Sequence, residues 1–182
     1  MLTHAQIEEA RQRAAHMLQQ AGIAIRAEER QDIEVAGFGL DALEHPGLEI
    51  VVYTNTERYC AKELVLFPRQ TCPDHRHPSV AGGPGKMETF RCRWGRVWLY
   101  VPGQPSASPH GQPPAGSEPY YSVFHEITLD PGDQYTIPPD TLHWFQAGGQ
   151  GAIVSEFSST SRDESDVFSD PRIRRLPQAG EA

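Results

Sequence analysis

Two histidines at alternating positions are the sharpest chemical feature of this sequence. His75 and His77 lie in the run CPDHRHP, residues 72–78. Side chains alternate between the two faces of an extended strand, so both imidazoles of an H-x-H pair point to the same side. Two imidazoles on one side suit a single metal ion. Alone the pair is a weak signal, because a chain with 8 histidines among 182 residues reaches such a pair easily by chance.

Further residues follow at spacings that strengthen the metal hypothesis. Glu88 comes after a loop rich in glycine and proline (78–87), and Gly95 follows it with six residues between. His143 ends the segment 131–143. Three imidazoles and one carboxylate form a mixed nitrogen and oxygen set that Mn, Fe, Co, Ni or Zn accepts. A six-coordinate ion held this way keeps two positions open for neighbouring oxygens of a small substrate.

These two blocks resemble the paired motifs of the cupin superfamily. The first motif reads H-x-H, a few residues, E, six residues, G; the second reads G, five residues, P-x-G, two residues, H. The resemblance implies four metal ligands, His75, His77, Glu88 and His143, inside a small double-sheeted antiparallel barrel. The gap before Glu88 is longer than usual, which indicates a Gly-rich loop beside the site. Asp140 replaces the glycine of the second motif, so a turn of a different kind is expected there.

Three separate stretches resemble one cupin family more closely, the D-lyxose ketol-isomerases. They are residues 72–101, 138–146 and 155–168, the last reading SEFSSTSRDESDVF. The resemblance implies an aldose–ketose isomerase that depends on a divalent metal, Mn²⁺ first. Its reaction would interconvert D-lyxose and D-xylulose, and commonly also D-mannose and D-fructose. A proton would move between neighbouring carbons through a metal-bound cis-enediolate.

Two residues are candidates for moving that proton. Glu156 alternates with Val154 on a strand, so it can point into the barrel and act as the base. The alternative is a solvated glutamate at a strand end. Lys86 stands two residues before Glu88 and can share its strand face, where it would hydrogen-bond a sugar oxygen or aid proton transfer. The alternative is a flexible loop lysine.

Three residues are candidates for binding the sugar. Arg162 and Asp166 offer a planar donor and a carboxylate acceptor for sugar hydroxyls, or else form an ion pair that faces solvent. Trp144 can form a wall against the carbon face of the sugar, although aromatic residues after a barrel strand are more often part of the core.

The elements that must position these residues are mostly strands. Gly and Pro number 16 each, too many for a helix bundle. The sequence predicts an all-β, cupin-type antiparallel jelly roll with β-prone runs at 47–54, 59–67, 89–93, 97–101, 120–129, 134–137 and 152–157. One amphipathic helix is expected over 4–21, started by a capping box of Thr3 and Gln6, ended near Gly22, and covering one side of the barrel.

Length, charge and cysteine content limit the number of domains, the partners and the location that the sequence is compatible with. We expect one domain over 1–182, with a helical cover (1–30), a mobile loop or lid (102–119) and a C-terminal tail (171–182). A formal charge of −8 gives no generic attraction to nucleic acid or to an anionic membrane. The polar N-terminus is not a signal peptide and three cysteines form no framework, which predicts a cytoplasmic location.

Other functions stay open at this point. A cupin isomerase acting on phosphorylated sugars would need a cationic pocket, and the residues that could form one, Arg69, Arg76, Arg91 and Lys86, are scattered. A non-catalytic sugar-sensing cupin would need an output module, and the 182 residues show no helix-turn-helix or other such module. An iron-dependent dioxygenase would use the same ligands. We also expect a homodimer, because strands within 32–40 can pair across a subunit interface.

Overall fold

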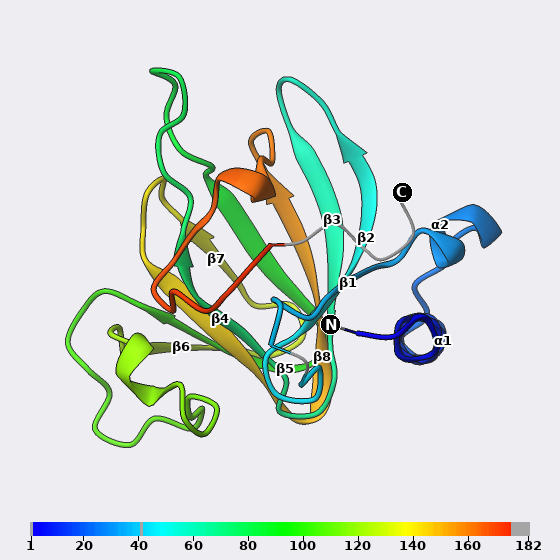
Figure 1. The fold of residues 1–182 in the computed structure, drawn as a ribbon, viewed down its shortest axis with the longest axis horizontal. Helices are drawn as coiled ribbons and strands as arrows, with labels where there is room; N and C mark the ends of the chain where they lie inside the picture. The colour runs from blue at the N-terminus through cyan, green and yellow to red at the C-terminus, as the bar shows by residue number, and fades with distance from the viewer. Residues whose placement is uncertain (1, 41, 176–182) are drawn as a thin grey trace.

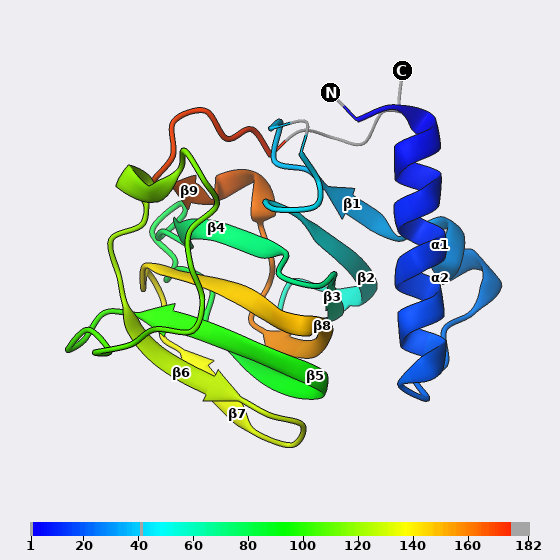
Figure 2. The ribbon, with the colours of Figure 1, turned by 90° about the horizontal axis from the view of Figure 1, so that it is seen from below.

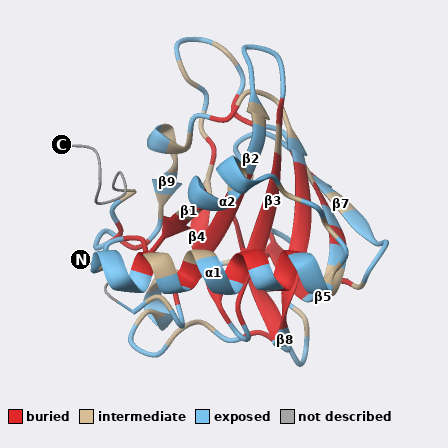
Figure 3. Cartoon of the chain, turned by 90° about the vertical axis from the view of Figure 1, so that its right-hand side faces the viewer, coloured by how far each residue is buried: buried red, intermediate tan, exposed pale blue. Residues whose placement is uncertain are grey.

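One long helix covers the outer face of a curled sheet. The computed structural model describes residues 2–40 and 42–175, and α1 (His4–Gln20) is its longest helix (Figure 1). Its capping box forms as the sequence predicts, with Gln6 N donating to Thr3 Oγ1 and Thr3 N to Gln6 Oε1. Gly22 follows with φ +70°, a left-handed conformation that glycine adopts without strain. Figure 3 shows the buried stripe of α1 lying against the strands.

The sheet is antiparallel and built around two long strands. Its order is β1-β2-β3-β8-β4-β9, and β5 pairs with β6, β7 and β8 (Figure 2). The strands are β1 (Glu34–Ala36), β2 (Leu48–Asn55), β3 (Cys60–Leu66), β4 (Thr71–Arg76), β5 (Glu88–Val101), β6 (His125–Leu129), β7 (Gln134–Ile137), β8 (His143–Ser158) and β9 (Val167–Phe168). The short helices are α2 (Ala27–Gln31), η1 (Glu118–Tyr120) and η2 (Asp163–Ser165). This curled half-barrel confirms the all-β cupin-type prediction.

Several strands begin or end at other residues than the sequence predicts. The runs 89–93 and 97–101 form one strand, β5, which bends at two bulges instead of ending. Gly95 lies at the bend with φ +70°, and a Cβ there would meet the carbonyl oxygen of Gly151 at 2.1 Å. β8 likewise begins nine residues before the predicted 152, and β6 begins at His125 instead of 120. Neither α2 nor β9 was predicted.

Two clusters of apolar side chains pack against the two faces of the sheet. Inward-facing residues of β3, β5 and β8 form the main core, among them Leu64, Leu66, Phe90, Phe145 and Val154. A second cluster fills the space between α1 and the outer face of the sheet.

Within the described residues, no helix is long and apolar enough to cross a membrane.

The segment 102–119 runs beside β5 and β6. Gly111 N donates to Tyr100 Oη at 2.6 Å, and the ring of His110 stacks on Trp98. Its mobility stays a prediction. Of the predicted tail, residues 176–182 lie outside the described residues, while Arg175 pairs with Glu34 and with Asp163.

One buried carboxyl on the outer face of the sheet makes stability depend on pH. Glu49 is fully buried; its Oε1 accepts from Gln70 Nε2 at 3.2 Å, and Oε2 has no partner in the described part of the chain. Burial raises the pKa of Glu49 to about 8, against the opposing effects of Gln70 and Arg13. The folded state therefore holds this proton more tightly than the unfolded chain, whose carboxyl titrates at 4.5.

The expected result is a loss of stability as the pH rises from about 4.5 to about 8. At about 1.4 kcal/mol per pKa unit, the loss is at most about 5 kcal/mol. Glu49→Gln removes this titration, so its free energy of unfolding in urea should fall less between pH 5 and pH 8 than that of the wild type. Equal slopes for the two proteins would contradict the buried, protonated state of Glu49.

Candidate metal centre

Two paired strands bring three histidines together. β4 and β8 are antiparallel, and their register places His75 opposite His143. His77 follows directly after β4, on the same side as His75 because of strand alternation. One ligand nitrogen from each imidazole lies within 4.8 Å of the others, and all three side chains are buried. This cluster could bind a metal ion.

Each of the three imidazoles has an acceptor at its Nδ1 atom. The contacts are His75 to Pro73 O at 2.7 Å, His143 to Thr141 O at 2.9 Å and His77 to Asp166 Oδ1 at 2.5 Å. These acceptors favour the tautomer that carries the proton on Nδ1, which leaves the lone pair of Nε2 for a metal. Such outer partners also fix the orientation of each ring.

Glu88, the first residue of β5, supplies a carboxylate to this cluster. Its Oε1 lies 3.1 Å from Nε2 of His77 and 3.0 Å from Nε2 of His143. The short second distance is not a well-formed hydrogen bond, because Nε2 of His143 is buried without a partner in the described chain. A metal ion between these atoms would satisfy that nitrogen, so the donor set fits a divalent cation.

The electrostatics of the cluster also suit a cation. Burial, together with the neighbouring imidazoles, holds the pKa of His75 well below its ordinary value, so its imidazole is neutral. Burial also lowers the pKa of His77, but Glu88 and Asp166 outweigh it and raise the pKa to about 9. The two carboxylates therefore attract positive charge to this point.

Beside Glu88 lie both residues predicted to move a proton. Lys86 Nζ is 2.8 Å from Glu88 Oε2 and 3.1 Å from Glu156 Oε1, and Ser158 Oγ donates to the same Oε1 at 3.0 Å. Glu156 and Lys86 are both buried. They therefore lie inside the barrel, which excludes the alternatives of a solvated strand end and a flexible loop.

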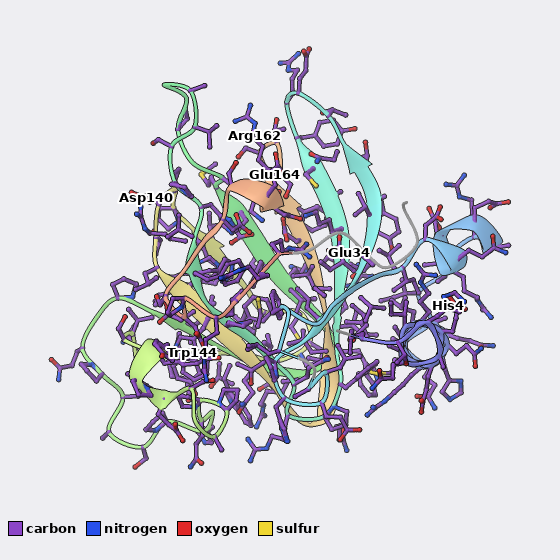
Figure 4. The ribbon with its side chains drawn as sticks, viewed as in Figure 1. His4, Glu34, Asp140, Trp144, Arg162 and Glu164 are labelled. Atoms are coloured by element: carbon purple, nitrogen blue, oxygen red, sulfur yellow. The ribbon has the colours of Figure 1, made fainter. Side chains whose placement is uncertain are left out.

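The residues predicted to bind sugar divide into two groups. Asp166 contacts His77 and lines the cavity, whereas Arg162 is exposed at the rim. Both line a second, outer pocket next to Lys86. Figure 4 shows Arg162 near Glu164, at the end of the barrel where β8 leads into η2.

Trp144 does not lie with the others. As the neighbour of His143 on a strand it faces the opposite side, where its ring stacks on Tyr100 with centroids 3.8 Å apart and its Nε1 donates to Val123 O. Figure 4 shows it well away from Arg162. Phe145, the next inward-facing residue, lines the cavity instead.

Sequence reasoning missed three charged residues in the cavity, Lys62, Asp163 and Arg175. Lys62, on β3, is 3% exposed and donates to Asp163 Oδ2 at 2.7 Å. Strand alternation was the available signal, because Lys62 shares its face with the core residues Leu64 and Leu66. Asp163 is the first residue of η2 and Arg175 comes after β9, so neither had such a signal. The cavity that these residues line measures about 410 Å³, including space open to solvent.

Comparison with known proteins finds close relatives along nearly the whole chain. No protein-family model matches the chain. It is 62% identical over 178 residues to the D-lyxose/D-mannose isomerase of Thermosediminibacter oceani, covering 98% of each chain. It is 64% identical over 169 residues to the D-lyxose ketol-isomerase of Cohnella laeviribosi, covering 93% of each.

Solved structures share the fold at low identity. The L-ribose isomerase of Cellulomonas parahominis matches with a TM-score of 0.78, and that of Acinetobacter sp. DL28, in complex with L-ribose, with a TM-score of 0.79. Both are 18% identical, and the matches cover 94% of each chain. At this identity the likeness concerns the fold.

The geometry predicts which histidines bind a metal. After removal of metal with EDTA, His143→Ala should lower the affinity for Mn²⁺ by more than about 100-fold, beyond the loss expected for an outer-shell partner. Isothermal titration calorimetry measures the affinity. The control is His16→Ala, which removes an exposed imidazole on α1 and should bind like the wild type. Equal affinities for all three proteins would contradict the site.

Proposed function

Because the chain belongs to the D-lyxose ketol-isomerase family, a family of aldose–ketose isomerases, we propose that it interconverts D-lyxose and D-xylulose with a divalent metal. D-Mannose and D-fructose are proposed as further substrates. The observation that carries the proposal is the buried pair of Lys86 and Glu156 beside a carboxylate and three imidazoles. Manganese as the native ion and a cytoplasmic location stay predictions from the sequence.

The proposed ligands are His75, His77, Glu88 and His143. A divalent ion there would supply positive charge that stabilises negative charge on O1 and O2 of the sugar. The chain itself supplies the orientation of the ligands, through the acceptors at each Nδ1 atom. Apolar side chains such as Phe90 and Phe145 line the same cavity and reduce its water content.

Glu156 is the proposed base. Its carboxylate would take the proton from C2 of the open-chain aldose and return it to C1, while the hydroxyl proton of O2 moves to O1. The ketose then forms through a cis-enediolate. Lys86 and Ser158 both contact Oε1, so the carboxylate has a fixed orientation.

Lys86 is proposed to hold a sugar oxygen while the proton moves. Burial lowers the pKa of Lys86, but Glu156 and Glu88 outweigh it and hold it well above its ordinary value. The amine therefore stays an ammonium, which donates hydrogen bonds and does not act as a base. Arg162 and Asp166 are proposed to bind hydroxyls farther along the sugar, whereas Trp144 has no part in the proposed site.

Free sugars fit the cavity better than phosphorylated ones. The cations that line it, Lys62, Lys86 and Arg175, each pair with a carboxylate already. A phosphate would have to displace one of these carboxylates, and Arg162 at the rim is the remaining cation nearby. The phosphosugar alternative therefore lacks a built anion site within the described chain.

The proposed base has a direct test. Glu156→Gln should lower kcat for D-lyxose by about 10²–10⁴-fold, because the amide cannot accept the proton. Affinity for Mn²⁺ should stay close to that of the wild type, since Glu156 is not a proposed ligand. Glu57→Gln, at an exposed turn, is the matched control.

Turnover is followed as ketose formed from D-lyxose, D-mannose and their phosphorylated forms. Full activity of the Glu156→Gln variant would overturn the assignment of the base. Turnover of phosphorylated sugars alone would replace the proposed substrate class.

We also propose a homodimer. β1 ends the strand order, so its outer edge has no strand partner within the described chain. Tyr59 and Phe157 each expose more than half of their side chains. Light scattering coupled to gel filtration should give twice the chain mass of 20.3 kDa. A mass of one chain at every concentration would contradict the dimer.

A further inference from the structure

Lys62 is one of only two lysines in the sequence, and both lie in the same cavity. The other is Lys86, while all remaining basic side chains are arginines. The side chain of Lys62 is 3% exposed and projects from β3 into the barrel. A buried ammonium is costly unless its donors find acceptors. The partners of Lys62 therefore indicate why it is there.

Those partners belong to the segment after β8. Lys62 Nζ donates to Ser161 Oγ at 2.8 Å and to Asp163 Oδ2 at 2.7 Å. Asn55 fixes the same segment through the backbone of Ser161, with two hydrogen bonds of 3.0 and 3.1 Å. From there the chain continues through η2 to Asp166, the partner of His77. Lys62 thus attaches the segment 161–166 to the barrel wall.

Lys62 also neighbours the proposed base. The β3–β8 register pairs Lys62 with Glu156, so both side chains project from the same face of the sheet. Lys86 contacts Glu156 from the other side, at 3.1 Å. Burial lowers the pKa of Lys62, but Glu156 and Asp163 outweigh it and raise the pKa. Glu156 therefore contacts one lysine, Lys86, and shares its face of the sheet with the other, Lys62.

From these contacts we infer that Lys62 is a positioning residue for the isomerisation: it holds Asp163 and the segment 161–166 against the cavity and places a positive charge on the face of the sheet that carries Glu156. The inference rests on the proposed function. It assigns Lys62 no contact with substrate. Its role is exerted through Glu156 and Asp163.

The direction of the pH effect follows from the charges that face Glu156. β3 presents Lys62, the loop before β5 presents Lys86, and β5 presents Glu88. The segment after β8 presents Asp163 and Asp166, and the C-terminal segment presents Arg175. Without Lys62, Glu156 would face Asp163 with one cation fewer between them. A carboxylate that loses a cationic neighbour binds its proton more tightly.

The test compares Lys62→Met, which removes the charge at similar length, with Lys62→Arg, which keeps it. In the manganese-loaded protein, Lys62→Met should lower kcat for D-lyxose by about 10–100-fold. The acidic limb of its kcat/KM profile should move up by about one pH unit. Lys62→Arg should restore most of the activity and the wild-type limb. Arg58→Met, an exposed cation beside β3, is the control and should match the wild type.

A second variant tests the same electrostatics with the opposite sign. Asp163→Asn removes an anionic neighbour of Glu156, so the acidic limb should move to lower pH. Circular dichroism and Tm show whether Lys62→Met folds. If it does not fold, the acidic limb of the Asp163→Asn variant alone tests the inference. A limb that stays at the wild-type pH in the folded variants would overturn the inference and leave Lys62 a purely structural role.

The two proposals fail in different ways. If the wild-type protein converts D-lyxose and Glu156→Gln is inactive, an unchanged profile in Lys62→Met overturns the role of Lys62 alone. If the wild type forms no ketose, or if Glu156→Gln keeps full activity, the proposed function fails first. In that case the inference about Lys62 fails with it.

Discussion

The burial of one carboxylate, Glu88, constrains everything around it. A charge inside an apolar barrel is stable only when cationic groups surround it. Lys86 contacts one oxygen of Glu88, and His77 and His143 lie beside the other. These contacts hold the pKa of Glu88 well below its ordinary value although burial opposes them. The carboxylate therefore stays ionised, and its neighbourhood is organised to receive positive charge.

Two long strands make that neighbourhood possible. β5 supplies Glu88 at its first residue, while β8 supplies His143 at its first residue and Glu156 near its end. A strand of that length can reach both ends of a curled sheet only if it bends. The close approach of Gly95 to Gly151 shows where the bend needs residues without side chains. The bend thus folds the sheet over, so that His143, at the start of β8, lies 3.0 Å from Glu88, which pairs with Ser158 at the end of β8.

Much of this arrangement could be predicted from local patterns. The alternation of His75 with His77, the capping box at Thr3 and the inward direction of Glu156 follow from strand and helix periodicity alone. The turn at Asp140 shows a limit of such reasoning. A different turn was expected because the motif has glycine there, yet Asp140 has φ 58°, in the left-handed region that glycine favours. Aspartate tolerates that region, so the turn does not have to change.

What the sequence could not supply is the register between distant strands. Strand alternation from His143 already indicates that Phe145 shares its side of the sheet and that Trp144 does not, but the stacking of Trp144 on Tyr100 depends on the pairing of β8 with β5. The same holds for Lys62, whose inward direction is local but whose partners lie about 100 residues away. Non-local contacts of this kind depend on how the sheet closes, which no short pattern records.

The balance of charge in the cavity connects the metal to the substrate. Four carboxylates line it, those of Glu88, Glu156, Asp163 and Asp166. Against them stand Lys62, Lys86, Arg175 and, without a metal, the imidazolium that the raised pKa of His77 implies. The charges are then balanced, so the cavity holds no excess of positive charge for an anionic sugar phosphate. A divalent ion that replaced the proton of His77 would leave an excess of positive charge beside the proposed substrate. That excess would stabilise negative charge on the oxygens of the sugar in the transition state more than it stabilises the neutral sugar in the ground state, which is the difference that catalysis requires.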